Sequence, residues 1–346
     1  MSWLFVLTLF FTVAAATLLG SGYLVQFLRH RSVLDRPNPR SSHQTPTPRG
    51  AGIAVIGIIL VTWIILAWSF PALIPGGLAK PGAVGLLCLC ALALALVSLI
   101  DDLRGLPPLI RLGVQFAVAL IGISTLPGGD EGLVFQGLLP PLMDKGLAVI
   151  AWVWFLNLFN FMDGIDGITG IEASTIGAGL FLLALFSGTD PGIGIFGLTI
   201  TAAALGFLWW NWPPARIFIG DVGSAPLGFL LGWLLLGLAI SGAWAAALIL
   251  PLAYLTDATW TLLRRLIRGE KVWQAHAQHF YQRALGLGMR HSDVARFFLI
   301  TDLGLVALAL ASTAKSFPGA PWLALSGACV LVFGLFHRLT RKNPEA

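Results

Sequence analysis

The amino-acid sequence predicts an all-α fold, a polytopic helical bundle that crosses a lipid bilayer about eleven times. Of its 346 residues, 57% are apolar and 11% are charged, and the mean hydropathy is +0.85. Soluble domains carry about a quarter charged residues, so this composition excludes a water-soluble globular protein. Apolar stretches of near-spanning length and a one-sided distribution of Lys and Arg also indicate this fold.

Eleven apolar segments are bounded by Pro, Gly or charged residues, and each is predicted to form one helix. In chain order they cover residues 3–28, 51–70, 83–100, 109–126, 146–160, 168–187, 191–210, 225–241, 244–262, 297–313 and 321–337. The residues that separate successive segments are Arg29, Pro71, Asp101, Pro127, Asp163, Gly188, Pro213, Gly242, Arg264 and Lys315.

The first segment is expected to be a retained span, because it is too long for a signal peptide and has no basic residue before it. Eleven spans of about 20 residues use roughly 220 residues, which leaves too few for a second folded domain. We therefore expect residues 1–346 to form one transmembrane domain. The three cysteines lie inside apolar runs, so they suggest neither disulfides nor a zinc site.

The positive charges predict an outside N-terminus and a cytoplasmic C-terminus. If the segments alternate from an outside start, the 21 Lys and Arg divide into eighteen on the inner side and three outside, which are Lys80, Lys145 and Lys315. Such an inner excess is typical of multi-pass membrane proteins. The net charge of +5 therefore reflects topology, and no nucleic-acid partner is expected.

The unusual polar residues fall almost entirely in the inner loops, which predicts that function is located at the cytoplasmic face. In chain order the motifs cover 35–43 with 46–50, 101–102, 157–167, Asn211 with 217–224, and 276–283.

Asp101 and Asp102 lie at the inner end of the third segment with no matching basic residue beside them. Two ionised carboxylates there repel each other unless they share a cation or a proton. A hard cation such as Mg²⁺ prefers oxygen ligands and leaves positions open for phosphate oxygens. A solvated helix end is the alternative interpretation.

Two further polar pairs are spaced three residues apart, Asn157 with Asn160 and Asp163 with Asp166. This spacing puts the members of each pair on one side if the segment is helical. A calcium loop would need a longer series of oxygen ligands ending in Glu, so a calcium site is not indicated. A polar helix cap remains the alternative.

The motif Gly220-Asp-Val-Gly-Ser224 opens the eighth segment, where backbone N–H groups and the helix dipole favour an anion. His276, His279 and Arg283 follow at helical spacing; zinc would need more ligands, which leaves diphosphate or nucleotide binding or an ordinary surface helix. Arg40, His43 and Arg49 occupy a Pro-rich, extended inner loop. These three either contact a phosphate group of a substrate or only face anionic lipid headgroups.

In order, type and location, these five motifs resemble those of the polyprenyl-phosphate N-acetylhexosamine-1-phosphate transferase superfamily, over residues 35–283. The resemblance implies a multi-pass enzyme of the bacterial cytoplasmic membrane that couples a UDP-N-acetylhexosamine donor to undecaprenyl phosphate. It implies Mg²⁺, or Mn²⁺ in its place, on Asp221 and Asp163, and catalytic roles for Asp101, Asp102 and Asp221. The predicted substrate-binding residues are Arg40, His43, Arg49, Asn157, Asn160, Asp163, Asp166, Asn211, His276, His279 and Arg283.

The sparse His segment with Tyr281-Gln-Arg283 looks more like the branch that initiates O-antigen or other surface polysaccharides. A phospho-N-acetylmuramoyl-pentapeptide transferase-like activity is the alternative within the superfamily. A secondary transporter and a membrane scaffold are alternatives from other classes, although transporters place their acidic groups near the bilayer midplane. The identity of the donor sugar and the oligomeric state, including a homodimer, stay open.

Overall fold

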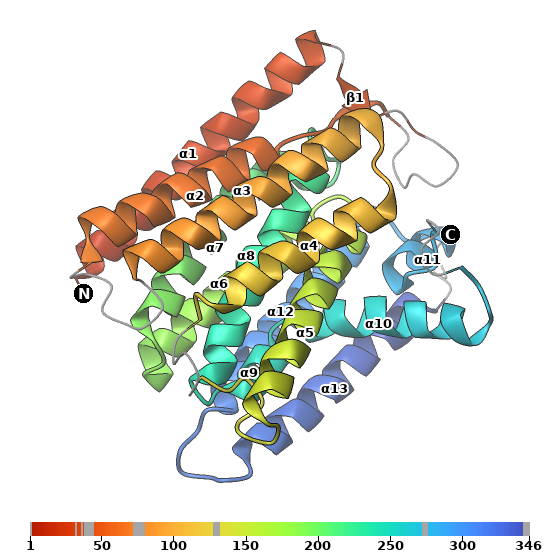
Figure 1. Ribbon diagram of the computed structural model, residues 1–346. Coiled ribbons are helices and arrows are strands. Elements are labelled where there is room, and N and C mark those ends of the chain that lie inside the picture. The colour runs from red at the N-terminus through yellow and green to blue at the C-terminus, as the bar shows by residue number, and fades with distance from the viewer. Residues whose placement is uncertain are drawn as a thin grey trace.

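The computed structural model describes residues 2–31, 33–35, 37, 45–71, 80–126, 132–271 and 276–341. These residues form a helical bundle, which confirms the predicted all-α class (Figure 1). The helices are α1 (Trp3–His30), α2 (Gly52–Ser69), α3 (Pro81–Arg104), α4 (Pro108–Ile123), α5 (Pro141–Phe161), α6 (Ile168–Ser187), α7 (Pro191–Asn211), α8 (Asp221–Ile240), α9 (Trp244–Ile249), α10 (Leu252–Ile267), α11 (Phe280–Gly286), α12 (His291–Ala311) and α13 (Ala320–Leu339).

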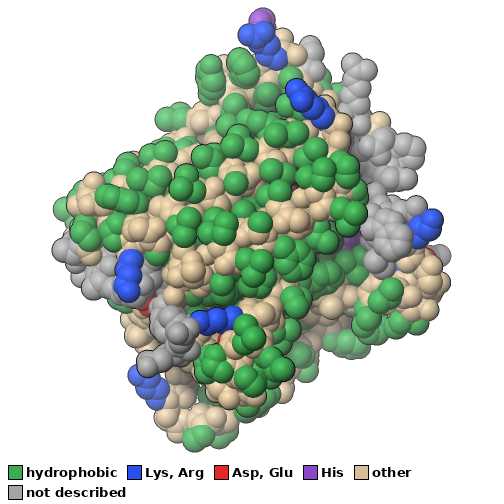
Figure 2. All heavy atoms as spheres, in the orientation of Figure 1, with side chains coloured by type: hydrophobic (Ala, Val, Ile, Leu, Met, Phe, Trp, Pro, Cys, Tyr) green, Lys and Arg blue, Asp and Glu red, His purple; other side chains and the backbone are tan. Residues whose placement is uncertain are grey.

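Nine helices in the described part of the chain are long and apolar enough to cross a membrane, and α4 is a shorter apolar helix. The surface agrees with a lipid environment, because a broad apolar face covers α1 to α4 (Figure 2). Exposed side chains on these helices include Phe11, Leu19, Leu89 and Leu120. A water-soluble protein rarely exposes an apolar face of this extent.

The predicted span 244–262 is wrong as a single helix. The structure divides it into α9 and α10, with Leu250 and Pro251 between them. Proline has no N–H to donate and its ring clashes with the carbonyl four residues earlier, so the helix is interrupted there. In Figure 1, α10 lies at a steep angle to α5 and α13 and extends toward α11.

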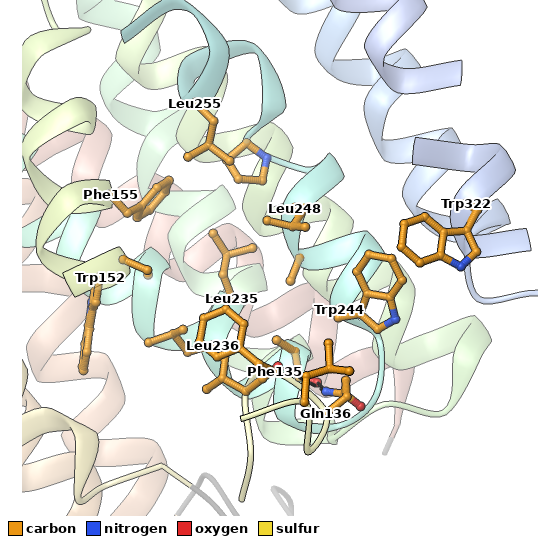
Figure 3. Close-up of a pocket in the computed structure, with 17 residues that line it drawn as sticks. Phe135, Gln136, Trp152, Phe155, Leu235, Leu236, Trp244, Leu248, Leu255 and Trp322 are labelled. Atoms are coloured by element: carbon orange, nitrogen blue, oxygen red, sulfur yellow. Dashed lines mark hydrogen bonds between the residues drawn. The ribbon is translucent and has the colours of Figure 1, made fainter. Parts of the chain in front are cut away.

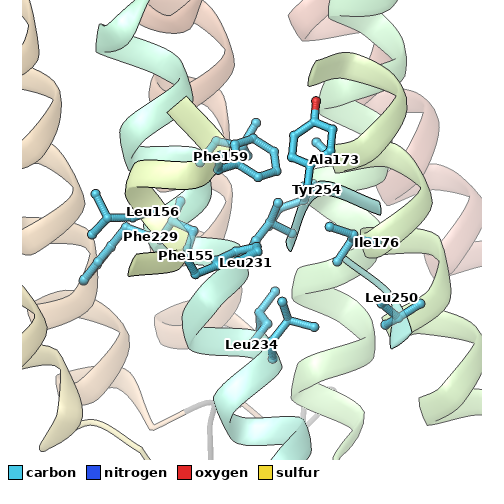
Figure 4. Packing of buried hydrophobic residues seen from close by; sticks show 14 of the residues in the cluster. Phe155, Leu156, Phe159, Ala173, Ile176, Phe229, Leu231, Leu234, Leu250 and Tyr254 are labelled. Atoms are coloured by element: carbon cyan, nitrogen blue, oxygen red, sulfur yellow. The ribbon is translucent and has the colours of Figure 1, made fainter. Parts of the chain in front are cut away.

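Helix α8 forms the centre of the bundle. In its most apolar window 94% of the residues are buried, compared with 22% in α1, which lies at the periphery. Trp152 of α5 stacks on Phe229 of α8 with 4.6 Å between ring centroids, and its indole N–H donates to the Phe229 carbonyl. Figure 4 shows this apolar packing continuing through Phe155, Phe159 and Leu231.

A short antiparallel strand pair lies between α1 and α2 in the sequence and leads the chain to the start of α8. Strand β1 (Leu34–Asp35) pairs with β2 (Thr47–Pro48). The chain continues from β2 through Arg49, which pairs with Phe218 in an isolated bridge, and Gly52 N–H donates to the Ile219 carbonyl at 2.9 Å. These contacts place the start of α2 against the start of α8.

Candidate active site

Arg49 lies between two aspartates that come from different helices. Its Nη2 is 2.6 Å from Oδ1 of Asp221, at the start of α8, and 3.3 Å from Oδ1 of Asp102, at the end of α3. The two carboxylates raise the pKa of the Arg49 guanidinium against the lowering effect of its burial. A fixed positive charge therefore joins the predicted catalytic residues Asp102 and Asp221.

Close backbone approach makes this arrangement possible. A Cβ added at Gly52 would lie 2.3 Å from Cα of Gly223, so the first turns of α2 and α8 are in contact. Gly220 has a φ of +73° and is followed directly by Asp221. A side chain at Gly220 would be strained and would crowd Arg49, whose Cγ lies 3.1 Å from the ideal Cβ position.

Asp101 has partners of its own. Its Oδ2 is 2.6 Å from Nη1 of Arg111, and its Oδ1 accepts a hydrogen bond from the N–H of Leu106 at 2.6 Å. The expectation that Asp101 and Asp102 have no basic partner is therefore wrong, and their repulsion does not require a shared cation or proton. Adjacent residues on a helix point in different directions, so each carboxylate has its own arginine.

Asp163 belongs to the cluster around Arg49. Its Oδ1 accepts a hydrogen bond from the Thr169 hydroxyl at 2.6 Å. Burial raises the pKa of Asp163 to about 6, while the Thr169 hydrogen bond and the charge of Arg49 oppose the rise and Asp221 and Asp102 add to it. Four loop or helix-end segments therefore converge here.

Asp166 has different partners from Asp163. Residues 162–167 form turns and coil rather than a helix, so the condition under which Asp163 and Asp166 would share one side of a helix is not met. Asp166 Oδ2 accepts a hydrogen bond from the Ala215 N–H at 3.0 Å, and its Oδ1 is 3.2 Å from Nδ1 of His291. Asp166 thus connects the loop before α6 to the start of α12.

The predicted amides divide into two groups. Asn157 and Asn160 both lie on α5 at the predicted helical spacing and line the same cavity. Asn160 accepts a hydrogen bond from the Ser224 hydroxyl at 2.7 Å. Asn211 is buried, where it accepts from the Gly167 N–H and donates to the Ile217 carbonyl, both at 2.9 Å. Asn211 therefore holds two site loops together.

The histidine motif reaches the same cavity through α10. Asp257 Oδ1 is 3.0 Å from Nδ1 of the buried His279 and accepts a hydrogen bond from the Phe280 N–H. His276 lines the cavity beside His279, and burial, with help from the charge of His279, lowers the pKa of His276 to about 4. His276 is therefore neutral near pH 7.

Arg283 differs from the two histidines. It is exposed and its guanidinium lies 5.8 Å from the ring centroid of Phe280, and it is not among the residues that line the cavity. Its neighbour Gln282 lines the cavity. Arg40 and His43 lie outside the described residues.

Two polar cavities adjoin this cluster. The first, of about 430 Å³, is lined on its polar side by Asp101, Arg111, Gln115, Asn157, Asn160, Asp221, His276, His279 and Gln282, and on its apolar side by residues such as Leu94, Val97 and Leu262. The second, of about 380 Å³, is lined by Thr45, Thr47, Asp166, Pro213, Pro214, Ala215, Phe218, Arg290, His291 and Ser292. Arg111 and Gln115 were missed because an isolated polar residue in an apolar chain gives no pattern. Phe218 lies in the predicted motif 217–224 but was given no role there.

A third cavity, of about 450 Å³, lies apart from the polar cluster. Figure 3 shows its walls of Trp152, Phe155, Trp244 and Trp322. Gln136 is its one amide-bearing side chain among the described residues. It offers no group for acid–base or phosphate chemistry.

Two carboxylates beside Arg49 are oxygen ligands of the kind that a divalent ion binds. No group of three or more His, Cys, Asp or Glu residues in the described ranges is arranged to hold a metal by itself. Mg²⁺ typically binds one or two carboxylates and completes its shell with water and substrate phosphates. Asp221 and Asp163 supply such carboxylates beside Arg49.

The chain is similar in sequence to proteins of one known enzyme family. Residues 84–239 match the family described as Glycosyl transferase family 4. The chain is 26% identical over 273 residues to the probable undecaprenyl-phosphate N-acetylglucosaminyl 1-phosphate transferase of Bacillus subtilis (strain 168), covering 75% of this chain and 71% of the relative.

Two further relatives align with 65% and 92% of this chain. The phospho-N-acetylmuramoyl-pentapeptide-transferase of Wolbachia sp. subsp. Brugia malayi (strain TRS) is 28% identical over 245 residues, with 65% of this chain and 72% of the relative covered. The decaprenyl-phosphate N-acetylglucosaminephosphotransferase of Mycobacterium leprae (strain TN) is 26% identical over 358 residues, with 92% and 86% covered.

Proposed function

The chain belongs to the polyprenyl-phosphate hexosamine-1-phosphate transferase family, and from this premise we propose that it transfers N-acetylhexosamine-1-phosphate from a UDP-sugar to undecaprenyl phosphate. The products are lipid-diphosphate-sugar and UMP. The observation that carries the proposal is the Asp102–Arg49–Asp221 arrangement, with Asp163 beside it, at a polar cavity that Asp221 lines. We place the reaction at the cytoplasmic face of the bacterial inner membrane.

The two cavities suit different substrates. We assign the lipid phosphate to the cavity of about 430 Å³, because its walls combine Arg111 and His276 with apolar residues such as Val97 and Leu262. We assign the nucleotide to the cavity of about 380 Å³, where Phe218 offers a ring for a base and Thr45 and Asp166 offer polar groups. The reacting phosphorus then lies between the cavities, near Arg49.

The reaction needs charge neutralisation more than a strong base. An oxygen of the lipid phosphate attacks the sugar-bearing phosphorus, and the bond from that phosphorus to the bridging oxygen of UMP breaks. One phosphoanhydride forms as another breaks, so the reaction is close to thermoneutral and reversible. The second pKa of a phosphate monoester is about 6, so the nucleophile is largely ionised near pH 7.

The residues of the cluster then have distinct roles. Arg49 opposes the charge that builds up on the transferring phosphoryl group, while Asp102 and Asp221 hold the guanidinium in place. Mg²⁺, or Mn²⁺ in its place, bound by Asp221 and Asp163 would neutralise diphosphate oxygens and orient them for in-line attack. Neutral His276 supplies a hydrogen bond rather than charge, the Asp257 carboxylate holds His279 in the cavity wall, and Asp101 orients Arg111 toward the incoming phosphate.

We further propose that the product initiates a surface polysaccharide such as O-antigen. The test is to offer purified protein undecaprenyl phosphate, Mg²⁺ and a panel of UDP-sugars, and to measure released UMP. UDP-N-acetylglucosamine or a deoxy relative as the preferred donor supports this branch, and a preference for UDP-N-acetylmuramoyl-pentapeptide contradicts it.

Site variants test the residue roles. Asp221→Asn and Asp102→Asn are expected to abolish UMP release, because each removes a carboxylate that contacts Arg49. The matched control is Asp190→Asn, since Asp190 caps α7 at the other end of the bundle, about 30 Å from the site along the 20-residue helix α6. Near-normal turnover in both site variants rejects the assignment.

A further inference from the structure

A pair of buried acids lies behind the site and takes no part in it. Glu172 of α6 and Asp302 of α12 are each 1% exposed. Their carboxyl groups contact each other within hydrogen-bonding range. None of their four carboxyl oxygens has a hydrogen-bond donor in the described part of the chain, and neither residue lines any of the cavities described above.

A third unsatisfied polar group, the hydroxyl of Tyr254, points to the same place. Tyr254 lies on α10, is fully buried, and has no hydrogen-bond partner for its hydroxyl among the residues described. Of the charged groups that act on this hydroxyl, Glu172 has the largest effect, and the Thr169 side chain contacts it. Figure 4 shows the hydroxyl directed away from the apolar cluster of Phe159 and Leu231 and toward α6 near Ala173.

Two ionised carboxylates cannot satisfy each other in this position. An ionised carboxylate only accepts hydrogen bonds, and two of them in contact repel strongly when buried. Neither Glu172 nor Asp302 forms an ion pair with a basic side chain within the described ranges. A proton or a cation must therefore lie between the two carboxyl groups.

We infer that Glu172 and Asp302 hold one proton between them. One carboxyl group is protonated and donates to the other, and the hydroxyl of Tyr254 donates to the carboxylate that remains. The remaining carboxylate then accepts from two donors, and the net charge of the pair falls from two negative charges to one. This buried protonation site connects α6, α10 and α12.

The protonation site connects to the reaction centre through α6 and α12. Thr169, one turn before Glu172, donates to Asp163, and α6 follows directly after the loop that carries Asp166. Helix α12 begins at His291, which contacts Asp166 at 3.2 Å. A shared proton between Glu172 and Asp302 thus bridges the two helices that hold this loop, which makes the pair a positioning element.

Infrared spectroscopy tests the proton directly. In mildly alkaline buffer, above the pKa of Asp163, the full-length protein is expected to show the carbonyl stretch of one protonated carboxyl group, shifted in heavy water. Glu172→Gln and Asp302→Asn should each abolish that band, because the amide donates a hydrogen bond in place of the proton and keeps the chain folded. Asp144→Asn is the matched control, since buried Asp144 already accepts from the N–H groups of Val134 and Phe135.

Each outcome decides the inference. Loss of the band in both single variants, with retention in Asp144→Asn, supports one shared proton. A band that survives in either single variant shows that both acids are protonated and overturns the inference. Absence of the band from the wild-type protein, with stability that depends on Na⁺ or K⁺, shows a bound cation instead. The spectrum does not depend on turnover, so it stands apart from the proposed transferase activity.

Discussion

Replacing Gly52 with alanine should disable the site without touching a charged residue. The added Cβ would lie 2.3 Å from Cα of Gly223 and 2.4 Å from its N, both backbone atoms that no rotamer change can move. Because ordinary contact begins at 3.4 Å, the starts of α2 and α8 must separate by about 1.1 Å. Arg49 lies three residues before Gly52, and Asp221 lies two before Gly223, so this separation moves the two groups apart.

The size of the effect follows from that displacement. A misplacement of about 1 Å in a catalytic arrangement costs on the order of 100-fold in rate, and overpacking costs roughly 1–3 kcal/mol of stability. We expect kcat for UMP release to fall by about two orders of magnitude in Gly52→Ala, measured well below its unfolding temperature.

Gly57→Ala is the matched control, because it makes the same change on the same helix where nothing lies within 4 Å. It should keep wild-type turnover and, since glycine inside a helix is unfavourable by roughly 0.5–1 kcal/mol relative to alanine, should not lower stability. Turnover in Gly52→Ala within a few-fold of wild type, or an equal loss in Gly57→Ala, refutes the reasoning.

Three further outcomes are expected. Arg49→Lys keeps the positive charge but loses the planar guanidinium and one of its hydrogen bonds. A hydrogen bond to a charged group contributes about 1.5–3 kcal/mol, so kcat for UMP release should fall by roughly 10- to 100-fold. An unchanged kcat contradicts the role proposed for Arg49. The pKa of His276 is about 4 in the folded chain and 6.5 in the unfolded chain. Between pH 4 and pH 6.5, His276 is therefore protonated in the unfolded chain and neutral in the folded chain. Stability should therefore fall as the pH drops from 6.5 to 4, and melting curves of His276→Gln should show less of this loss, whereas parallel pH profiles argue against it. Chelation should stop UMP release and added Mg²⁺ should restore it, and activity that persists in chelator removes the metal from the proposal.

Much of the helical framework could be predicted from local sequence. The predicted segments 168–187 and 191–210 match α6 and α7 almost residue for residue, because Gly188 and Pro191 separate them and each helix is apolar throughout. The segment 244–262 failed although Pro251 is visible in the sequence, because its apolar composition outweighed the break. Apolar composition indicates that a segment is buried or faces lipid, but it does not indicate whether the segment forms one uninterrupted helix.

The site was predictable as a set of loops but not as a set of contacts. The location of Asp102, Asp163 and Asp221 at helix ends on one face followed from the alternation of spans. The pairing of Arg49 with Asp221 spans 172 positions and has no local signal. The same is true of Asp257 with His279, which only the turn of α10 toward α11 brings together.

The sequence by itself determined the membrane environment and the order of the motifs, and it predicted that the motifs gather at one face, since hydropathy and charge act on each segment separately. Only the tertiary structure decided that Asp101 and Asp102 separate to different arginines, that Asp166 joins His291, that Arg283 lies outside the cavity, and that Glu172 meets Asp302. These contacts depend on how helices distant in the chain pack and rotate against one another, and short-range preferences do not specify that packing.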